Sequence, residues 1–417
     1  MKRAALALGL AALAAVPVLA QVGGPVPQTQ NPDAPRSGSS GFPGVGLSIR
    51  LGGKKKAPEP ALTGPPLEMR DRAIPDFVPG QVLFFITGDE AAAKRIARTG
   101  RVRFVRIEPL PEMGVAMVVA ALQAGAPVPA AVERLGRLPG VEWAQPDFEF
   151  QMLGNSRELG AGLSGIKLGP KHKVSGTIVM IDSPVDLGNP ALAGARITQQ
   201  GFGGAMTPSP HGTAVAELLV GTGTFAGVAQ GAQLVSLAAF APVGEDWWRS
   251  QSSLVLVAAD RALALRPNVL NLSFGTRRDD PALARALARF EERGTCVVAA
   301  AGNGGGGPVL FPARHPAVLA VTAIDGGKRV YTYASRGPEI DIAAWGVGMN
   351  AAVPGGRRAV SGSSFATAIV SGAMLRLPAC ARDRKPAGMR TSVAATAQDL
   401  GPKGRDDIFG AGLMRLR

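Results

Sequence analysis

Residues 177–182 read TIVMID, a short apolar run that ends in a carboxylate. A continuous apolar run of this length is typical of a strand that is buried on both faces of a sheet. Such strands occur mainly in parallel sheets, where helices cover both faces. The run therefore predicts a buried strand that brings Asp182 to its carboxyl end.

The chain that follows this strand alternates between strands and helices. Apolar stretches predict strands over residues 234–237, 269–274 and 296–300, and helices over residues 211–220, 254–265 and 281–293. This alternation predicts an α/β domain with a mainly parallel sheet between helices. Active sites in such folds lie beyond the carboxyl ends of the strands, so we expect catalytic residues where the strands end.

Two residues near these strand ends have side chains suited to proton transfer. Asp182 ends the first strand, although a lone aspartate there is more often a turn or cap residue. His211 begins an apolar helix, whereas His172 lies between two lysines and His315 falls in an expected surface turn. Because imidazole is the usual base near neutral pH, His211 is the candidate base.

A serine and an asparagine complete the set of candidates. Residues 361–368 read SGSSFATA and precede an apolar run, so they place a hydroxyl at a helix N-terminus. Free N–H groups and the helix dipole favour developing negative charge there. Residues 299–304 read AAAGNG after a strand, where Asn303 is placed to donate its side-chain N–H to an oxyanion. Each segment alone also fits an ordinary helix cap or turn.

In the order Asp182, His211 and Ser364, with these flanks, the chain resembles the subtilisin-like serine peptidases over roughly residues 160–417. That family has His-Gly-Thr at its histidine, as at residues 211–213, and Gly-Thr-Ser-Met-Ala at its nucleophile, with Ser363 here in the place of the threonine. The resemblance implies a three-layer subtilisin-like domain, a Ser-His-Asp triad with an acyl-enzyme intermediate, and Asn303 in the oxyanion hole.

The same resemblance suggests which residues bind the substrate. Residues 271–275 resemble the strand that pairs with the substrate backbone, so Ser273, Phe274 and Gly275 are expected to bind substrate, together with Gly302 and Leu310. The stretches 271–275 and 303–311 contain no acidic residue, which argues against a preference for basic side chains. Leu310 is expected to shorten the main pocket in favour of small or medium apolar residues.

The chain departs from the family pattern beside the aspartate and after the serine. Pro184 stands where glycine is usual, and Ala368 and Ile369 replace the usual proline and histidine. Proline fixes φ and lacks an N–H, so the turn beside Asp182 is expected to differ. These changes leave a second interpretation open, in which the protein keeps the fold as a non-catalytic binding or scaffold protein.

The region before residue 160 divides into three parts. Residues 1–20 carry two basic residues, an apolar stretch and a small final residue, so they predict a signal peptide cut after Ala20 and a secreted or periplasmic protein. Residues 21–72 are rich in Pro and Gly and predict a linker. Residues 73–155 predict a small ferredoxin-like α+β unit with the order βαββαβ.

This α+β unit resembles the propeptide domain of the same family, which serves as an intramolecular chaperone and inhibitor. Residues 139–147 look like its final strand. Maturation is then expected between about residues 150 and 163, before a peptidase domain over residues 160–417.

Composition limits the expected partners. The chain has 417 residues and a net charge of +14, but its basic residues are scattered, so we expect a basic surface and no nucleic-acid site. The expected partners are protein or peptide substrates and the chain's own propeptide. We also expect a monomer without a membrane anchor. No cofactor or metal site is expected; calcium often stabilises this family, but no carboxylate cluster identifies a site. Cys296 and Cys380 are either a disulfide or two buried thiols.

Two other classes of enzyme fit less well. Gly302, Gly304 and Gly307 match the Gly-x-Gly-x-x-Gly pattern of dinucleotide-binding oxidoreductases. That pattern must open a helix, and Pro308 and Pro312 argue against one. An esterase would favour a Gly-x-Ser-x-Gly motif and the order Ser, Asp, His, and neither occurs here.

Overall fold

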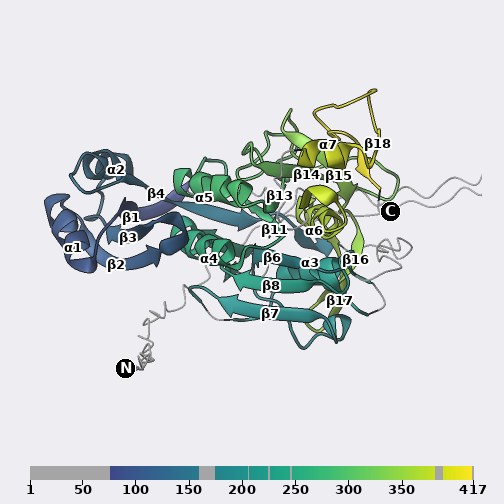
Figure 1. Cartoon of the computed structure of the whole chain (residues 1–417), viewed down its shortest axis with the longest axis horizontal. Coiled ribbons are helices and arrows are strands. Elements are labelled where there is room, and N and C mark those ends of the chain that lie inside the picture. Colours follow the sequence, from purple (N-terminus) through teal and green to yellow (C-terminus); the bar gives the residue numbers. More distant parts are fainter. Residues whose placement is uncertain are drawn as a thin grey trace, which may run out of the picture. The chain divides into compact units, whose positions relative to one another are not determined.

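Strand β6 (Thr177–Asp182) lies inside a nine-stranded sheet (Figure 1). This computed structural model describes residues 76–158, 174–204, 206–223, 226–244, 247–380 and 388–415, all within one unit, Leu62–Arg417. Every neighbouring pair of strands is parallel except the first. From edge to edge the strands are β18 (Ala397–Gln398), β19 (Leu413–Met414), β15 (Ile340–Trp345), β14 (Val318–Ile324), β13 (Cys296–Ala300), β11 (Val269–Leu272), β6, β8 (Gln233–Ala238) and β7 (Arg196–Gly201).

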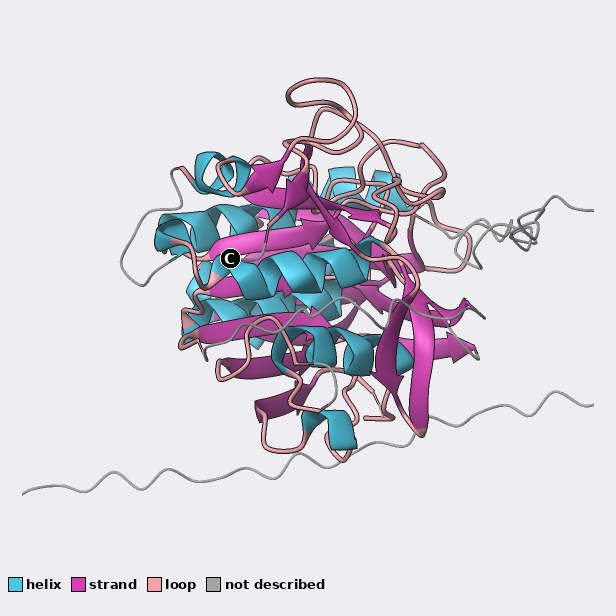
Figure 2. Cartoon of the chain, turned by 90° about the vertical axis from the view of Figure 1, so that its right-hand side faces the viewer, coloured by secondary structure: helices cyan, strands magenta, loops and turns pink. Residues whose placement is uncertain are grey.

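Side chains of β6 point alternately into two hydrophobic cores. Ile178 and Met180 belong to one core, Val179 and Ile181 belong to the other, and all four are fully buried. This is the pattern expected when helices cover both faces of a sheet, and Figure 2 shows helices packed over the strands. The predicted α/β fold with a mainly parallel sheet is confirmed. The first core is completed by α3 (Pro210–Val220), α6 (Ser363–Met374) and α7 (Met389–Ala394), and the second by α4 (Ser252–Leu265) and α5 (Pro281–Glu292).

One predicted strand is divided in the structure. Residues 269–274 were expected to form a single strand, but β11 ends at Leu272 and the short β12 (Phe274–Gly275) follows. The division arises because β11 pairs within the central sheet, whereas β12 pairs antiparallel with a strand of the small α+β unit over residues 76–152, which is called the N-terminal unit below. The backbone therefore leaves the central sheet at Ser273, beside the expected active site.

The described part of the N-terminal unit, residues 76–152, has the predicted order βαββαβ. Three antiparallel pairings give the strand order β2-β3-β1-β4. One face of this sheet packs on its own two helices, and the other face, including Leu83 and Phe85, joins the core beneath α4 and α5. The elements are β1 (Phe77–Ile86), α1 (Glu90–Thr99), β2 (Arg103–Leu110), a 3-10 turn (Pro111–Met113), β3 (Val115–Ala121), α2 (Val128–Gly136) and β4 (Trp143–Met152).

Strand β4 links this sheet to the region around Ser273. Beyond its pairing with β1, it pairs with β10 (Trp247–Gln251) and β12, and β10 pairs with β9 (Ala241–Gly244). After β4, β5 (Asn155–Glu158) adds a third strand to the hairpin of β16 (Met349–Val353) and β17 (Gly356–Ser361). Two further 3-10 turns are η3 (Pro190–Leu192) and η4 (Pro378–Cys380). The segment from β4 to β5 therefore passes the carboxyl ends of the central strands, where Leu153 contacts Asn303 and Gly154 lies against His211.

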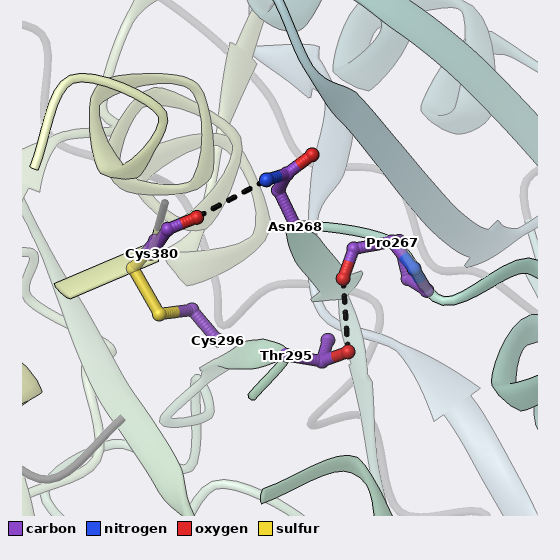
Figure 3. The surroundings of a disulfide bond; sticks show 5 residues. All are labelled: Pro267, Asn268, Thr295, Cys296 and Cys380. Carbon is purple, nitrogen blue, oxygen red and sulfur yellow. Dashed lines mark hydrogen bonds between the residues drawn. A yellow bond between two sulfur atoms is a disulfide. The ribbon is translucent and has the colours of Figure 1, made fainter. Parts of the chain in front are cut away.

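A disulfide joins Cys296 and Cys380 (Figure 3). Of the two alternatives left open by the sequence, the structure has the bridge. It ties the first residue of β13 to the turn that follows α6, and Asn268 Nδ2 donates to the carbonyl of Cys380 at 3.2 Å. The bridge thus connects the strand that leads to Asn303 with the helix that begins at Ser363.

Among the described residues, no helix combines the length and the apolar character needed to cross a bilayer.

Candidate active site

Asp182 and His211 are in direct contact beyond the carboxyl end of β6. Asp182 Oδ1 accepts a hydrogen bond from His211 Nδ1 at 2.9 Å. The same oxygen accepts from the backbone N and the Oγ of Ser183, at 2.7 and 2.9 Å. The aspartate is fully buried and the histidine side chain is 7% exposed. This carboxylate therefore holds the imidazole in the tautomer that carries its proton on Nδ1 and leaves Nε2 able to accept one.

The first turn of α3 fixes the position of His211. Ser209 is the N-cap of this helix, and its Oγ accepts from the backbone N of His211 at 3.1 Å. Ser209 is also tied to the turn after Asp182, because its backbone N donates to the carbonyl of Pro184 at 2.8 Å. Pro184 lacks an N–H, but its carbonyl still joins the two segments. The departure from the family pattern is thus compatible with the contact between Asp182 and His211.

Ser364 lies in the first turn of α6, close to Ser273. Its Oγ donates to the carbonyl oxygen of Ser273 at 2.9 Å. His211 Nε2 is buried and has no hydrogen-bond partner among the described residues. The hydroxyl is therefore turned away from the imidazole, and rotation about the Cα–Cβ bond of Ser364 is needed to bring Oγ to Nε2.

Asn303 and Ser364 donate to the same carbonyl oxygen. Asn303 Nδ2 and the backbone N of Ser364 lie 2.8 and 3.1 Å from the oxygen of Leu153. The amide orientation of Asn303 is fixed because its Oδ1 accepts from the backbone N of Ser363 at 3.1 Å. Gly362 allows this approach, since an added Cβ would lie 2.6 Å from the oxygen of Leu153. Two fixed donors on one carbonyl are the geometry of an oxyanion hole.

The segment that ends at Leu153 lies as a strand between two others. On one side Met152 pairs with Phe274 and Gln151 with Gly275, and on the other side residues 149–151 pair with residues 249–251 of β10. The backbone N of Leu153 donates to the carbonyl of Ser273 at 3.1 Å. The chain therefore carries an extended peptide of its own in the site, with a defined register.

The residues expected to bind substrate surround this segment. An added Cβ at Gly275 would lie 2.9 Å from Leu153 Cδ1 and 3.1 Å from Leu310 Cβ, and one at Gly302 would lie 2.9 Å from Leu310 Cγ. The absence of a side chain at both glycines thus makes room for Leu153 and Leu310. The Phe274 ring packs edge-on against Phe150, with their centroids 5.4 Å apart.

Of the two remaining histidines, the structure describes His315 alone. His315 is half-buried beside Phe311, where burial lowers the pKa of its imidazole. His172 lies outside the described residues. Within the described ranges, no group of three or more His, Cys, Asp or Glu side chains is placed to hold a metal ion. The structure therefore identifies no site for the calcium ion that the family resemblance allowed.

Two buried carboxylates lie where the N-terminal unit meets α4 and α5. Asp147 of β4 accepts from the backbone N and the Oγ of Ser253 at 2.9 and 2.8 Å, at the start of α4. Asp280 caps α5 and accepts from Gln145 Nε2 at 2.9 Å. Burial raises the pKa of Asp147 to about 6 and also raises the pKa of Asp280. The N-terminal unit thus supplies polar side chains to the first turns of two helices.

Two residues that shape this site are given no role by the sequence motifs. Leu153 falls in the region of expected maturation, but only the folded chain shows that its carbonyl accepts hydrogen bonds from Asn303 and Ser364. Phe365 was quoted in the serine motif without a role, and its fully buried ring lies 5.5 Å from the imidazole of His211, centroid to centroid. The signal was visible in the sequence, because phenylalanine stands where the family motif has methionine.

Comparisons with known proteins identify the family of the chain. A model of the subtilase family matches residues 177–412, more than half of the chain. Subtilisin E of Bacillus subtilis (strain 168) is 28% identical over 300 residues, which cover 69% of this chain and 77% of that protein. A thermophilic serine proteinase of Bacillus sp. (strain AK1) is 28% identical over 305 residues, which cover 68% and 74% of the two chains.

Solved structures give the same result for the fold. Fervidolysin from Fervidobacterium pennivorans, a keratinolytic enzyme related to subtilisin, matches with a TM-score of 0.65 and 22% identity over 84% of this chain. The match spans only 61% of the fervidolysin chain and concerns the fold alone. A mutant of the protease domain of PatA matches with a TM-score of 0.53 and 26% identity, over 59% of this chain and 94% of that structure.

Proposed function

The chain belongs to the subtilase family and is a serine-type endopeptidase; on that premise we propose that Ser364, His211 and Asp182 are its catalytic triad and that it is made as a secreted, self-inhibited precursor. One observation carries the proposal. The oxygen of a single peptide carbonyl, that of Leu153, receives hydrogen bonds from Asn303 and from the backbone of Ser364. The next residue, Gly154, lies against His211, which is paired with Asp182.

In this proposal His211 moves the proton that makes Ser364 a nucleophile. The serine hydroxyl turns from the carbonyl of Ser273 to His211 Nε2, which takes its proton as Oγ attacks the scissile carbonyl. Asp182 stabilises the imidazolium that forms, because Oδ1 already accepts from Nδ1. The imidazolium then returns the proton to the leaving amine, and a water molecule repeats the sequence on the ester.

Asn303 and the backbone N of Ser364 stabilise the charge that develops on the carbonyl oxygen. Both donors are held by the fold before the reaction begins, so they need no reorganisation in the transition state. Every step uses a side chain or a backbone group of the chain itself. We therefore expect full activity without an added cofactor or metal, with calcium contributing to stability where it binds.

Protein and peptide chains are the substrates of this endopeptidase class. We propose that they bind as an extended strand between β10 and β12, where β4 now lies, with Ser273, Phe274 and Gly275 along one side. Gly302 and Leu310 then line the pocket for the side chain whose carbonyl is attacked. The fit of Leu153 between Gly275 and Leu310 supports a preference for medium apolar residues.

The precursor is inhibited in this proposal because its own strand β4 fills the substrate position. Residues 76–152 pack on α4 and α5 while the following residue places its carbonyl in the oxyanion hole. The expected signal peptide over residues 1–20 would carry the protein to the periplasm or out of the cell; that segment lies outside the described residues. No nucleic acid, membrane anchor or second subunit is required.

Labelling with a fluorophosphonate probe tests the triad. We expect the purified, processed protein to be labelled on Ser364 and the variants Ser364→Ala and His211→Ala to remain unlabelled. Mass spectrometry of the labelled fragment would report the residue modified and the length of the processed chain. A folded, processed protein that takes up no probe and hydrolyses no peptide would favour the alternative of a non-catalytic binding or scaffold protein.

A further inference from the structure

The bond between Leu153 and Gly154 occupies the reactive position of the site. The oxygen of Leu153 receives both donors of the oxyanion hole, and its backbone N donates to Ser273. The antiparallel register with β12 and β10 fixes this placement, because a slip by one residue would turn every side chain of the strand to the opposite face. Neighbouring peptide bonds are thereby excluded from the same position.

The space on the far side of this bond admits only glycine. A Cβ added to Gly154 would lie 2.8 Å from two ring carbons of Phe365 and 3.0 Å from His211 Cδ2. Contacts this short require a neighbour to move. The backbone of Gly154 has no positive φ, so steric space, and not backbone conformation, requires the glycine.

Phe365 cannot readily make room for a larger residue. Its ring is fully buried in the core that α6 shares with α3, and it lies against the imidazole of His211. Well-packed interiors resist displacement of a single ring. Gly154, whose nitrogen is the leaving group of this bond, thus lies against the imidazole that must protonate it.

We propose that the chain cuts itself between Leu153 and Gly154, at a leaving-side subsite that Phe365 restricts to glycine. The proposal rests on the function proposed above and names the processing bond and a specificity-determining residue of the same site. It assigns Gly154 as the first residue of the mature enzyme and Leu153 as the last residue of the released N-terminal fragment.

The chemistry balances with water as the only co-reactant. His211 takes the proton of Ser364 as Oγ bonds to the carbonyl carbon of Leu153, whose π pair moves to oxygen. When that pair returns to the carbonyl bond, the C–N bond to Gly154 breaks and the nitrogen of Gly154 takes the proton from His211. The products of this step are a free amine on Gly154 and an ester between Leu153 and Ser364. Water then gives a proton to His211 and its oxygen to the ester carbon, and Ser364 regains a proton as Leu153 leaves as a carboxylic acid.

Processing of the full-length precursor tests the bond and the subsite together. We expect wild type to yield a new N-terminus at Gly154 by mass spectrometry, and Gly154→Ala to process about ten- to a hundredfold more slowly. Gly136→Ala is the matched control, because a Cβ there meets nothing within 4 Å, and it should process at the wild-type rate. Adding Phe365→Met to Gly154→Ala should restore most of the rate, since an unbranched methionine side chain can adapt its shape.

A peptide pair keeps the test decisive if the Phe365 variant fails to fold. Processed wild-type enzyme should hydrolyse a peptide of residues 147–158 with a kcat/KM at least about tenfold above that of the same peptide carrying Gly154→Ala. Equal rates would overturn the glycine restriction. The enzyme could instead have a different mature N-terminus while its processing still requires Ser364 and the protein still takes up fluorophosphonate. That result would overturn the assignment of the cleaved bond but leave the proposed function standing. Loss of labelling and processing alike would overturn both.

Discussion

Raising the pH from about 5 to about 8 should weaken the binding of the N-terminal unit to α4 and α5. Burial is the largest cause that raises the pKa of Asp147 from 3.8 to about 6. When the unit leaves, water solvates this carboxylate and its pKa returns to the ordinary value. The docked form therefore binds the proton more tightly, so its contribution to docking is complete below about pH 4 and is lost as the pH rises through 6.

The magnitude follows from the same two pKa values. Integrated from 3.8 to about 6, the full linkage amounts to at most about 3 kcal/mol, or on the order of a hundredfold in the dissociation constant. Between about pH 5 and pH 8 the same two pKa values leave about tenfold of this change, or about 1.4 kcal/mol. The groups that face Asp147 are Gln81 of β1, Ser253 of α4 and the carboxylate of Asp280, and the last acts in the same direction. Asp260 of α4, which accepts from the backbone N of Met113 at 3.0 Å, also has its pKa raised to about 6, chiefly by burial.

The assay uses the product expected from the proposed cut between Leu153 and Gly154, in which the N-terminal fragment would be bound without a covalent link. Its dissociation constant would be measured by size-exclusion chromatography of dilution series between about pH 5 and pH 8, a readout that does not depend on the protonation of His211. Asp147→Asn keeps the shape of the side chain but does not titrate, so its pH dependence should be weaker. Docking that stays constant or tightens with rising pH would refute the reasoning.

Three other perturbations have expected outcomes. Asn303→Ala should lower kcat about 10²- to 10³-fold, because one of two oxyanion donors is lost, while Ser364→Ala should leave almost no peptide hydrolysis; an Asn303→Ala enzyme of wild-type rate would contradict the assignment. Leu310→Ala should deepen the main pocket, so that kcat/KM for peptides with phenylalanine at the cleaved residue rises about tenfold relative to matched peptides with leucine. An unchanged ratio would show that Leu310 does not determine the depth of the pocket. Replacing Cys296 and Cys380 by alanine should lower the free energy of unfolding by about 4–5 kcal/mol in the chain-entropy model, because the bridge spans 84 residues; urea unfolding would measure it, and an unchanged midpoint would count against that model.

The fold was predictable where hydrophobic periodicity was strong. Continuous apolar runs correctly placed β6 and β13, and the run after His211 correctly placed α3. The same reasoning failed at Ser273, where a run that looked like one strand changes partners from the central sheet to β4. Such a change depends on which segment lies alongside, and a local pattern does not contain that information.

Candidate catalytic residues were predictable because each follows a strand or begins a helix. The sequence singled out Asp182, His211, Ser364 and Asn303, and the structure brings them to one place. It could not show that Leu153 lies among them, because that contact joins residues more than a hundred positions apart along the chain. The rotamer of Ser364, which turns its hydroxyl to Ser273, is likewise a property of the folded site.

Strand β4 also protects two sheet edges. Where it pairs with residues 249–251 and 274–275, it satisfies backbone N–H and C=O groups that would otherwise form open edges. Removal of β4 leaves β10 and β12 flanking an empty slot, and such edges bind extended chains largely through backbone hydrogen bonds. The open backbone groups that let an endopeptidase accept varied sequences therefore also make an unoccupied site prone to pairing with unfolded chains. A newly made molecule avoids such pairing as long as β4 fills the slot.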